Sequence, residues 1–215
     1  MPAHKETPLI FKSFFKNTLI GLDIQLREIR LIQLGRGRQS LQISHQAEKI
    51  LPCEIGEDGV IRDWEALLVE LSAWVRERGV IGSKTAIALP LQQVKRQTLR
   101  LPEHLQDEEI EAEVRDCLER ETYIAAESYA VDFARLAVED GMLVVAFAAV
   151  ARAYLDRYVQ CVEAAGLRVK VVDIDTDAVA RAEATLSRCD QVFRESVDIS
   201  YYRALGLALR EVPLW

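Results

Sequence analysis

The sequence predicts an α/β fold in which one larger lobe, built on a mixed sheet, carries a small inserted β-α-β-β subdomain. Apolar runs over residues 18–50 indicate three successive strands, which favours an antiparallel meander. Residues 63–90 place a helix before a buried strand, a crossover that adds a parallel strand. Residues 91–152 change to the order strand, helix, strand, strand. With 215 residues, the chain is long enough for two lobes with buried cores.

The opening meander is expected at Thr18–Ile24, Glu28–Leu34 and Leu41–Ile50. Gly35–Arg38, with the sequence Gly-Arg-Gly-Arg, separates the second strand from the third. Because glycine tolerates positive φ, this segment is predicted to be a hairpin turn.

A short apolar strand delivers an acidic residue to the first turn of this meander. The run Leu19–Ile24 contains Asp23, Gln25 follows, and the chain returns as a strand from Ile29. This is the shape of the first phosphate hairpin of the actin-like ATPases, where an Asp helps to hold the metal and phosphates of a nucleotide. An Asp at a strand end is also an ordinary turn residue. Gly21, Asp23 and Gln25 are therefore the candidate nucleotide-binding residues, and the hairpin alone leaves both interpretations open.

The first helix is bracketed by Asp63, a good N-cap, and by Gly79, a good terminator. Trp64 and Trp74 fall on its apolar face, and we interpret both as core anchors rather than as ligand platforms. The buried strand Thr85–Leu89 follows.

The inserted subdomain begins with a strand, Val94–Leu101, whose two faces are poorly separated in polarity. Arg96, Thr98 and Arg100 share one face of it. This pattern indicates either an edge strand or a functional surface.

A helix is predicted over 107–121, and its other faces carry eight acidic residues, which we interpret as a solvated surface. Strands Ser128–Val138 and Met142–Ala149 are joined by the hairpin signal Glu139–Gly141. The expected apolar face of the helix consists of Ile110, Val114, Cys117 and Leu118.

The last third of the chain is expected to form a helix over 153–165, a strand at Leu167–Ile174, a helix to about Arg188 and a closing helix at Ile199–Leu209. The predicted core stripe of the closing helix is Ile199, Tyr202, Leu205 and Leu209.

Three carboxylates, Asp173, Asp175 and Asp177, alternate where the strand passes into the helix. They offer oxygen ligands for a divalent cation, but no glycine-bearing calcium loop accompanies them. We therefore favour N-cap and turn roles, and no metal site is predicted.

Composition excludes several functions. A net charge of −7 and a pI near 5.2 argue against nucleic acid as a partner, because phosphate binding needs a basic face. The longest apolar run, Met142–Ala151, is about half as long as a membrane span requires. With no C-x-x-C spacing and no secretory leader, the cysteines are expected to be buried free thiols in a reducing cytosol. They are Cys53, Cys117, Cys161 and Cys189.

Several segments together resemble the PilM family, the cytoplasmic actin-like proteins of type IV pilus assembly, over about residues 18–210. The inserted subdomain is similar to the small subdomain that this family shares with the division protein FtsA. The segments that carry the resemblance are Ile20–Ile24, Gly59–Trp64, Lys84–Pro90, Leu99–Pro102, Glu121–Ile124, Val131–Phe133, Ala164–Leu167, Val171–Asp175 and Ala204–Arg210.

The resemblance implies an actin-like (ribonuclease H-like) single lobe formed by 18–90 and 153–212, with the small subdomain at 91–152. Residues 1–17 are expected to be a flexible lead-in. The family continues after the helix near 177–188 into a second lobe, and here the short connector 189–198 stands in its place.

The sequence differs from the family at positions that would contact a nucleotide. The family carries a glycine and small hydroxyl residues after the hairpin Asp, whereas Gln25, Leu26 and Arg27 stand here. A second Asp-x-Gly hairpin and a glycine-rich adenosine motif are also missing from the sequence. No catalytic residue and no cofactor are therefore expected. The alternative is an ATPase that binds ATP and Mg²⁺ with its missing lobe supplied by another chain.

The resemblance also implies a partner, the cytoplasmic tail of a PilN-like inner-membrane protein within the pilus assembly complex. The expected protein is a non-enzymatic adaptor, cytoplasmic and peripheral at the inner membrane through that partner. Its peptide groove is expected between the two lobes, lined by Arg96, Thr98 and Arg100 and walled by the helices that begin near 107 and 153. The alternative for these three residues is a solvent-facing edge protected by charge.

Overall fold

The computed structural model describes residues 19–36 and 41–211 and divides into two compact units. The main unit comprises Met1–Leu89 and Cys161–Trp215, and the small unit comprises Pro90–Gln160. The predicted lead-in at 1–17 lies outside the described residues.

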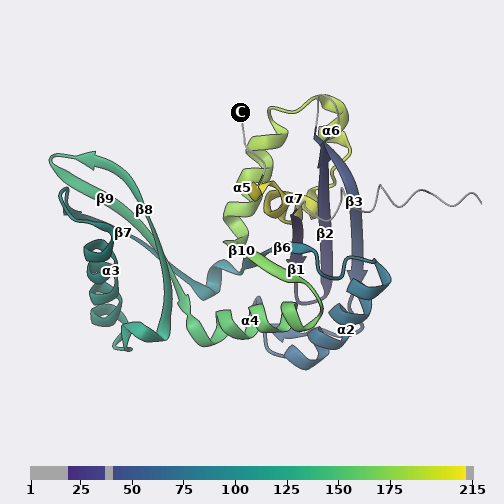
Figure 1. The fold of residues 1–215 in the computed structure, drawn as a ribbon, viewed down its shortest axis with the longest axis horizontal. Coiled ribbons are helices and arrows are strands. Elements are labelled where there is room, and N and C mark those ends of the chain that lie inside the picture. The colour runs from purple at the N-terminus through teal and green to yellow at the C-terminus, as the bar shows by residue number, and fades with distance from the viewer. Residues whose placement is uncertain (1–18, 37–40, 212–215) are drawn as a thin grey trace, which may run out of the picture. The chain divides into compact units, whose positions relative to one another are not determined.

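The main unit contains a five-stranded mixed sheet in the order β10-β6-β1-β2-β3 (Figure 1). β1, β2 and β3 form the predicted antiparallel meander, and β1, β6 and β10 run parallel. The predicted parallel crossover is therefore confirmed. The strands are β1 (Ile20–Ile24), β2 (Glu28–Arg36), β3 (Leu41–Ile50), β6 (Lys84–Leu89) and β10 (Arg168–Ile174).

The predicted turn at 35–38 is wrong in its first half. Gly35 and Arg36 continue β2 and pair with Gln42 and Leu41. The ladder extends because Leu34 and its partner Ile43 both pack on the core. The second half of the predicted turn falls outside the described residues.

Helix α2 (Trp64–Glu77) covers one face of the main sheet and begins as predicted, with the Asp63 side chain accepting a hydrogen bond from the Ala66 N–H at 2.9 Å. An ion pair between Lys49 of β3 and Glu70 of α2 identifies that face. Trp64 and Trp74 are buried, so their predicted core role is confirmed. Between β3 and α2 lies the short hairpin β4 (Gly56–Glu57) and β5 (Val60–Ile61).

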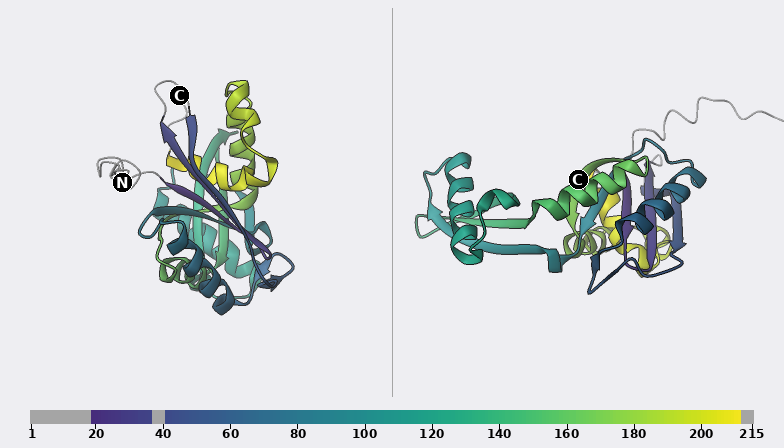
Figure 2. Two further views of the ribbon diagram at one scale, coloured as in Figure 1. Left: turned by 90° about the vertical axis from the view of Figure 1, so that its right-hand side faces the viewer. Right: turned by 90° about the horizontal axis from the view of Figure 1, so that it is seen from below.

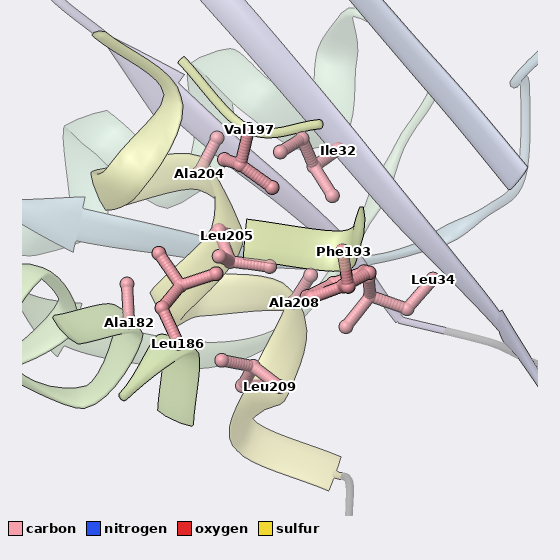
Figure 3. Packing of buried hydrophobic residues seen from close by; sticks show 10 residues of the cluster. All are labelled: Ile32, Leu34, Ala182, Leu186, Phe193, Val197, Ala204, Leu205, Ala208 and Leu209. Carbon is pink, nitrogen blue, oxygen red and sulfur yellow. The ribbon is translucent and has the colours of Figure 1, made fainter. Parts of the chain in front are cut away.

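The opposite face is covered by the C-terminal elements, whose buried side chains form one cluster with β2 (Figure 3). The predicted closing helix starts late, because Ile199–Tyr201 is a separate 3-10 turn, η4, and Ile199 is 76% exposed. The core stripe was therefore wrong at Ile199 and right at Leu205 and Leu209. The elements are α5 (Asp175–Leu186), α6 (Gln191–Glu195), α7 (Tyr202–Ala208) and the 3-10 turn η5 (Leu209–Glu211).

Two glycines allow α7 to pack backbone to backbone. A Cβ at Gly21 of β1 would lie 1.9 Å from the carbonyl oxygen of Ala204. A Cβ at Gly206 would lie 1.7 Å from the carbonyl oxygen of Ala178 in α5. Neither position has room for a side chain, so α7 lies directly on β1 and on α5.

The small unit contains a three-stranded antiparallel sheet in the order β7-β9-β8, with α3 along one face (Figures 1 and 2). The predicted inward residues Ile110, Val114, Cys117 and Leu118 are all buried. The predicted turn is confirmed by positive φ at Asp140 and Gly141. The elements are the 3-10 turn η2 (Leu91–Gln93), β7 (Val94–Pro102), α3 (Asp107–Thr122), the 3-10 turn η3 (Ala126–Ser128), β8 (Tyr129–Glu139), β9 (Met142–Ala151) and α4 (Arg152–Ala164), which runs on into the main unit.

The cysteines are free thiols, but their expected burial holds only for Cys117 and Cys161. Cys53 is exposed, because it lies in the irregular segment after β3, and Cys189 is half-buried. Within the part of the chain that the structure describes, none of the helices combines the length and the apolar character of a membrane span.

Candidate functional site

Asp23, the predicted nucleotide-hairpin carboxylate, lies at the end of β1 and is 1% exposed. Its Oδ1 accepts a hydrogen bond from Arg203 Nη1 of α7 at 2.9 Å. Its Oδ2 accepts one from the Gln25 side chain at 2.8 Å. The structure thus brings Asp23 and Gln25 into contact, and it adds an arginine from the far end of the chain.

The electrostatics of Asp23 are dominated by burial. Desolvation raises the pKa of Asp23 above its ordinary value of 3.8, although Arg203 and, more weakly, Arg30 act to lower it. Arg30 is itself engaged by Glu28 and Glu48 at 2.5 and 2.7 Å. Arg203 is therefore the main cationic partner of the carboxylate.

A second buried carboxylate, Asp173, ends β10 and is 5% exposed. Its Oδ2 accepts hydrogen bonds from Arg181 Nη1 of α5 at 2.7 Å and from Arg210 Nε of η5 at 3.0 Å. Arg181 also donates to the Gly206 carbonyl at 2.9 Å. Asp173 therefore connects the sheet to α5 and to η5, the turn that follows α7.

The two carboxylates lie at the same level of the sheet. Leu22 and Val172 both pair with Ile87 of β6, so Asp23 and Asp173 each come one residue further along. With one strand between them, they are separated by about 10 Å. The carboxyl ends of parallel strands are where α/β sheets usually bind ligands, and here that edge holds two carboxylate–arginine clusters.

N-cap and turn roles were predicted for Asp173, Asp175 and Asp177, and this prediction is wrong for Asp173. Asp173 is neither an N-cap nor a turn residue, because the N-cap of α5 is Ile174 and the carboxylate of Asp173 is held by arginines. Asp175 and Asp177 lie in the first turn of α5, where negative charge suits the helix dipole. Among the described residues, no group of three metal-ligating side chains occurs.

The arrangement around Asp23 is poorly suited to Mg²⁺, because both carboxylate oxygens already accept hydrogen bonds from Arg203 and Gln25. The positive charge next to the carboxylate is the guanidinium of Arg203. The third predicted residue, Gly21, lies against the backbone of α7.

The second predicted site lies in the small unit. Arg96, Thr98 and Arg100 are all exposed and share the face of β7 that points away from α3. They were expected beside the helix that begins near 107, but the sheet separates them from α3, which packs against the face of Leu99 and Leu101. The period-2 alternation of a strand forces this result.

The two edge strands of this sheet differ. From Val94 to Pro102, β7 pairs residue for residue with β9. The β8 ladder shifts register between Arg135 and Ala137, which leaves a bulge at Leu136. A bulge twists an edge strand away from further pairing, and a regular edge lacks that protection.

Polar contacts tie both sides of β7 to its own unit. On the outer face Arg100 lies 3.6 Å from Glu139 and 3.4 Å from Asp140. On the inner face Lys95 pairs with Glu121 of α3, and the Gln97 side chain donates to Glu121 at 2.9 Å.

Sequence reasoning missed Arg203, Arg181 and Arg210, and no local spacing connects them to the carboxylates. Arg203 lies 180 residues from Asp23. It also missed Tyr123, which is 93% exposed with φ of 57°. For Tyr123 the available signal was its position directly after the end of the acidic helix.

Comparison with solved structures shows the fold. A chain of the PilM–PilN type IV pilus biogenesis complex is 22% identical with a TM-score of 0.68, over 80% of this chain and 52% of that chain. The cytoplasmic domain of EpsL, an inner membrane component of the type II secretion system of Vibrio cholerae, is 17% identical with a TM-score of 0.48, over 75% and 59%. The chain thus spans about half the length of the first relative. The fold is the expected actin-like one, and no curated protein matches.

Comparison with protein families gives a match to the type IV pilus assembly protein PilM over residues 21–202. The matched range includes β1 from its second residue, with Asp23, the whole small unit and the first residue of α7. The chain therefore belongs to the PilM family of type IV pilus assembly proteins.

Proposed function

We propose that this protein is a non-enzymatic adaptor of type IV pilus assembly that binds the cytoplasmic tail of a PilN-like inner-membrane protein as a strand added to β7. The adaptor would be held at the cytoplasmic side of the inner membrane through that tail. The observation that carries the proposal is the regular, exposed edge of β7, which pairs on one side only among the described strands. The solved relative is itself a complex of PilM with PilN.

Strand addition suits β7 better than β8. An added strand takes backbone hydrogen bonds from an unpaired edge, and its alternate side chains meet the two faces of the sheet. The edge of β7 is unbroken over nine residues, whereas the bulge at Leu136 interrupts β8. Arg96 and Arg100 would lie beside the outward-facing side chains of the added strand.

The non-enzymatic part of the proposal is supported by the buried carboxylate of Asp23. Its hydrogen bonds to Arg203 and Gln25 leave it poorly placed to hold Mg²⁺. Titration of Mg-ATP against the pure protein is expected to show no binding below about 1 mM. Tight binding that is lost in Asp23→Asn would instead support the ATPase whose second lobe comes from another chain.

The peptide proposal is tested by calorimetry with a synthetic peptide of the tail of the PilN-like protein encoded by the same genome. We expect a Kd of roughly micromolar order, as is usual for a short peptide. Two further peptides carry N-methyl groups on alternate residues, one set at odd and one at even positions. Because every second N–H of an added strand faces the sheet, one set should abolish binding and the other should preserve it.

A matched pair of substitutions locates the site on the sheet. Arg100→Glu on β7 reverses a charge beside the added strand and is expected to change the Kd by about tenfold. Leu136→Glu, an equally exposed change on the other edge strand, should leave the Kd unchanged. Equal effects of the two substitutions, or absence of any binding, would contradict the proposal.

A further inference from the structure

Tyr123, which ends α3, is the most exposed large hydrophobic side chain among the described residues, at 93%. It occupies the helix C-cap with φ of 57°, a left-handed conformation that glycine or asparagine normally adopts. The next residue, Ile124, is 48% exposed. An aromatic ring held out in a conformation unfavourable for it indicates a role in contact with another molecule.

The contacts of α3 place its C-terminal end, which Tyr123 follows directly, over β7. Glu121, two residues before Tyr123, holds both Lys95 and Gln97 of β7. The N-terminal end of α3 lies at the other edge strand, since Asp107 pairs with Arg135 of β8 at 2.7 Å. The helix thus crosses the sheet diagonally, and its C-terminus arrives at the first half of β7.

In the last turn of α3, Arg120 is paired with Asp116, and the carboxylate of Glu119 lies close to Tyr123 along the helix. Tyr123 N–H donates to the Glu119 carbonyl at 2.9 Å, so Glu119 lies one helical turn before it. The Glu119 side chain is exposed and makes no hydrogen bond or ion pair with another described residue. A carboxylate beside an exposed aromatic face favours a cation that can stack on the ring.

We infer that the partner strand carries an arginine or lysine on its α3-facing side, which stacks on Tyr123 with Glu119 beside its charge. The inference rests on the proposed function and names the chemistry of the partner at one position. Cytoplasmic segments close to a membrane span are enriched in Lys and Arg, which supports a basic residue in a membrane-anchored tail. Exposed tyrosines of this kind frequently dominate the affinity of an interface.

The test uses the full chain, the PilN-like tail peptide and a version of the peptide with its Lys and Arg replaced by Gln. Tyr123→Asn removes the ring and suits the left-handed backbone, whereas Tyr123→Phe keeps the ring. We expect about tenfold weaker binding for Y123N, less than threefold for Y123F, and about threefold for Glu119→Gln with a smaller dependence on salt. Val192→Ala, an exposed apolar change in the main unit, is the control and should have no effect.

The outcomes separate the inference from the proposed function. If the wild-type chain binds the peptide and Y123N binds equally well, the stacking inference is overturned and the adaptor proposal stands. Equal affinity for the Gln-substituted peptide overturns the inference in the same way. Absence of binding to the wild-type chain overturns both.

Discussion

The carboxylates of the main sheet and the polar side chains of β7 are both strand residues of one chain, but their surroundings are opposite. Asp23 and Asp173 are buried, and the C-terminal elements pair the first with one arginine and the second with two. Arg96, Thr98 and Arg100 are exposed along a sheet edge. The same residue types that suggest a binding site in a sequence therefore act as internal supports in one unit and as surface in the other.

This difference shows that the contribution of a charged side chain to stability depends more on its partner and burial than on its position in a sequence motif. A buried ion pair contributes less than its Coulomb energy, yet removal of one member leaves an uncompensated charge. An exposed ion pair contributes about 0–1 kcal/mol. The two regions should therefore respond very differently to similar substitutions.

The largest loss of stability is expected from substitutions where α7 packs on the sheet and on α5. Gly206→Ala should destabilise the main unit by about 3 kcal/mol or more, because its Cβ would meet backbone that cannot move aside. Gly35→Ala, whose nearest neighbour is the Ser44 Cβ at 3.3 Å, should cost less than about 1 kcal/mol. Tryptophan fluorescence during urea unfolding measures this unit selectively, because residues 90–160 contain no tryptophan.

The second-largest loss of stability is expected when a buried carboxylate is removed. Asp173→Asn should lower the free energy of unfolding by about 2–3 kcal/mol, because Arg181 and Arg210 lose their shared partner. Tryptophan fluorescence during urea unfolding measures this loss, as for Gly206→Ala. A change below about 0.5 kcal/mol would show that the cluster does not hold the C-terminal elements to β10.

The pH dependence of stability tests Asp23. Because burial raises its pKa in the folded state, the folded protein retains a proton that the unfolded chain has released. The contribution of Asp23 to stability should therefore fall as pH rises from about 3.8 to the raised pKa, and remain low above it. Asp23→Asn lacks this titration, so its stability relative to wild type should increase over the same window. Urea unfolding at a series of pH values measures the difference, and a constant difference would contradict the assignment.

The smallest effect is expected at the exposed edge. Arg100→Ala should change stability by less than about 0.5 kcal/mol, because its contacts to Glu139 and Asp140 are solvent-exposed. Arg203→Ala, the matched change at a buried carboxylate, should cost about 2 kcal/mol. Thermal unfolding followed by circular dichroism compares the two variants, and similar losses would remove the distinction between the regions.

Most of the fold was accessible from the sequence because its elements carry strong local signals. The Asp63 cap, the terminator Gly79 and the apolar stripe of α3 each predicted an element that the structure confirms. Failures occurred where packing overrides local pattern. Gly35 looks like a turn residue but extends β2, and Ile199 fits a helical stripe but lies in a 3-10 turn on the surface.

The candidate sites were harder to predict for a physical reason. Sequence spacing brought Asp23 and Gln25 together because they are neighbours, but it carries no information about Arg203. The face of β7 that holds Arg96 was ambiguous because both faces are mixed in polarity. Only the packing of α3 against Leu101 determines which face is free.

The bulge at Leu136 has a consequence for assembly. A sheet that accepted a strand at each of its two edges could bind two tails at once. If the tail adds to β7 as proposed, the irregular margin at β8 leaves one regular edge, and a one-to-one stoichiometry is expected.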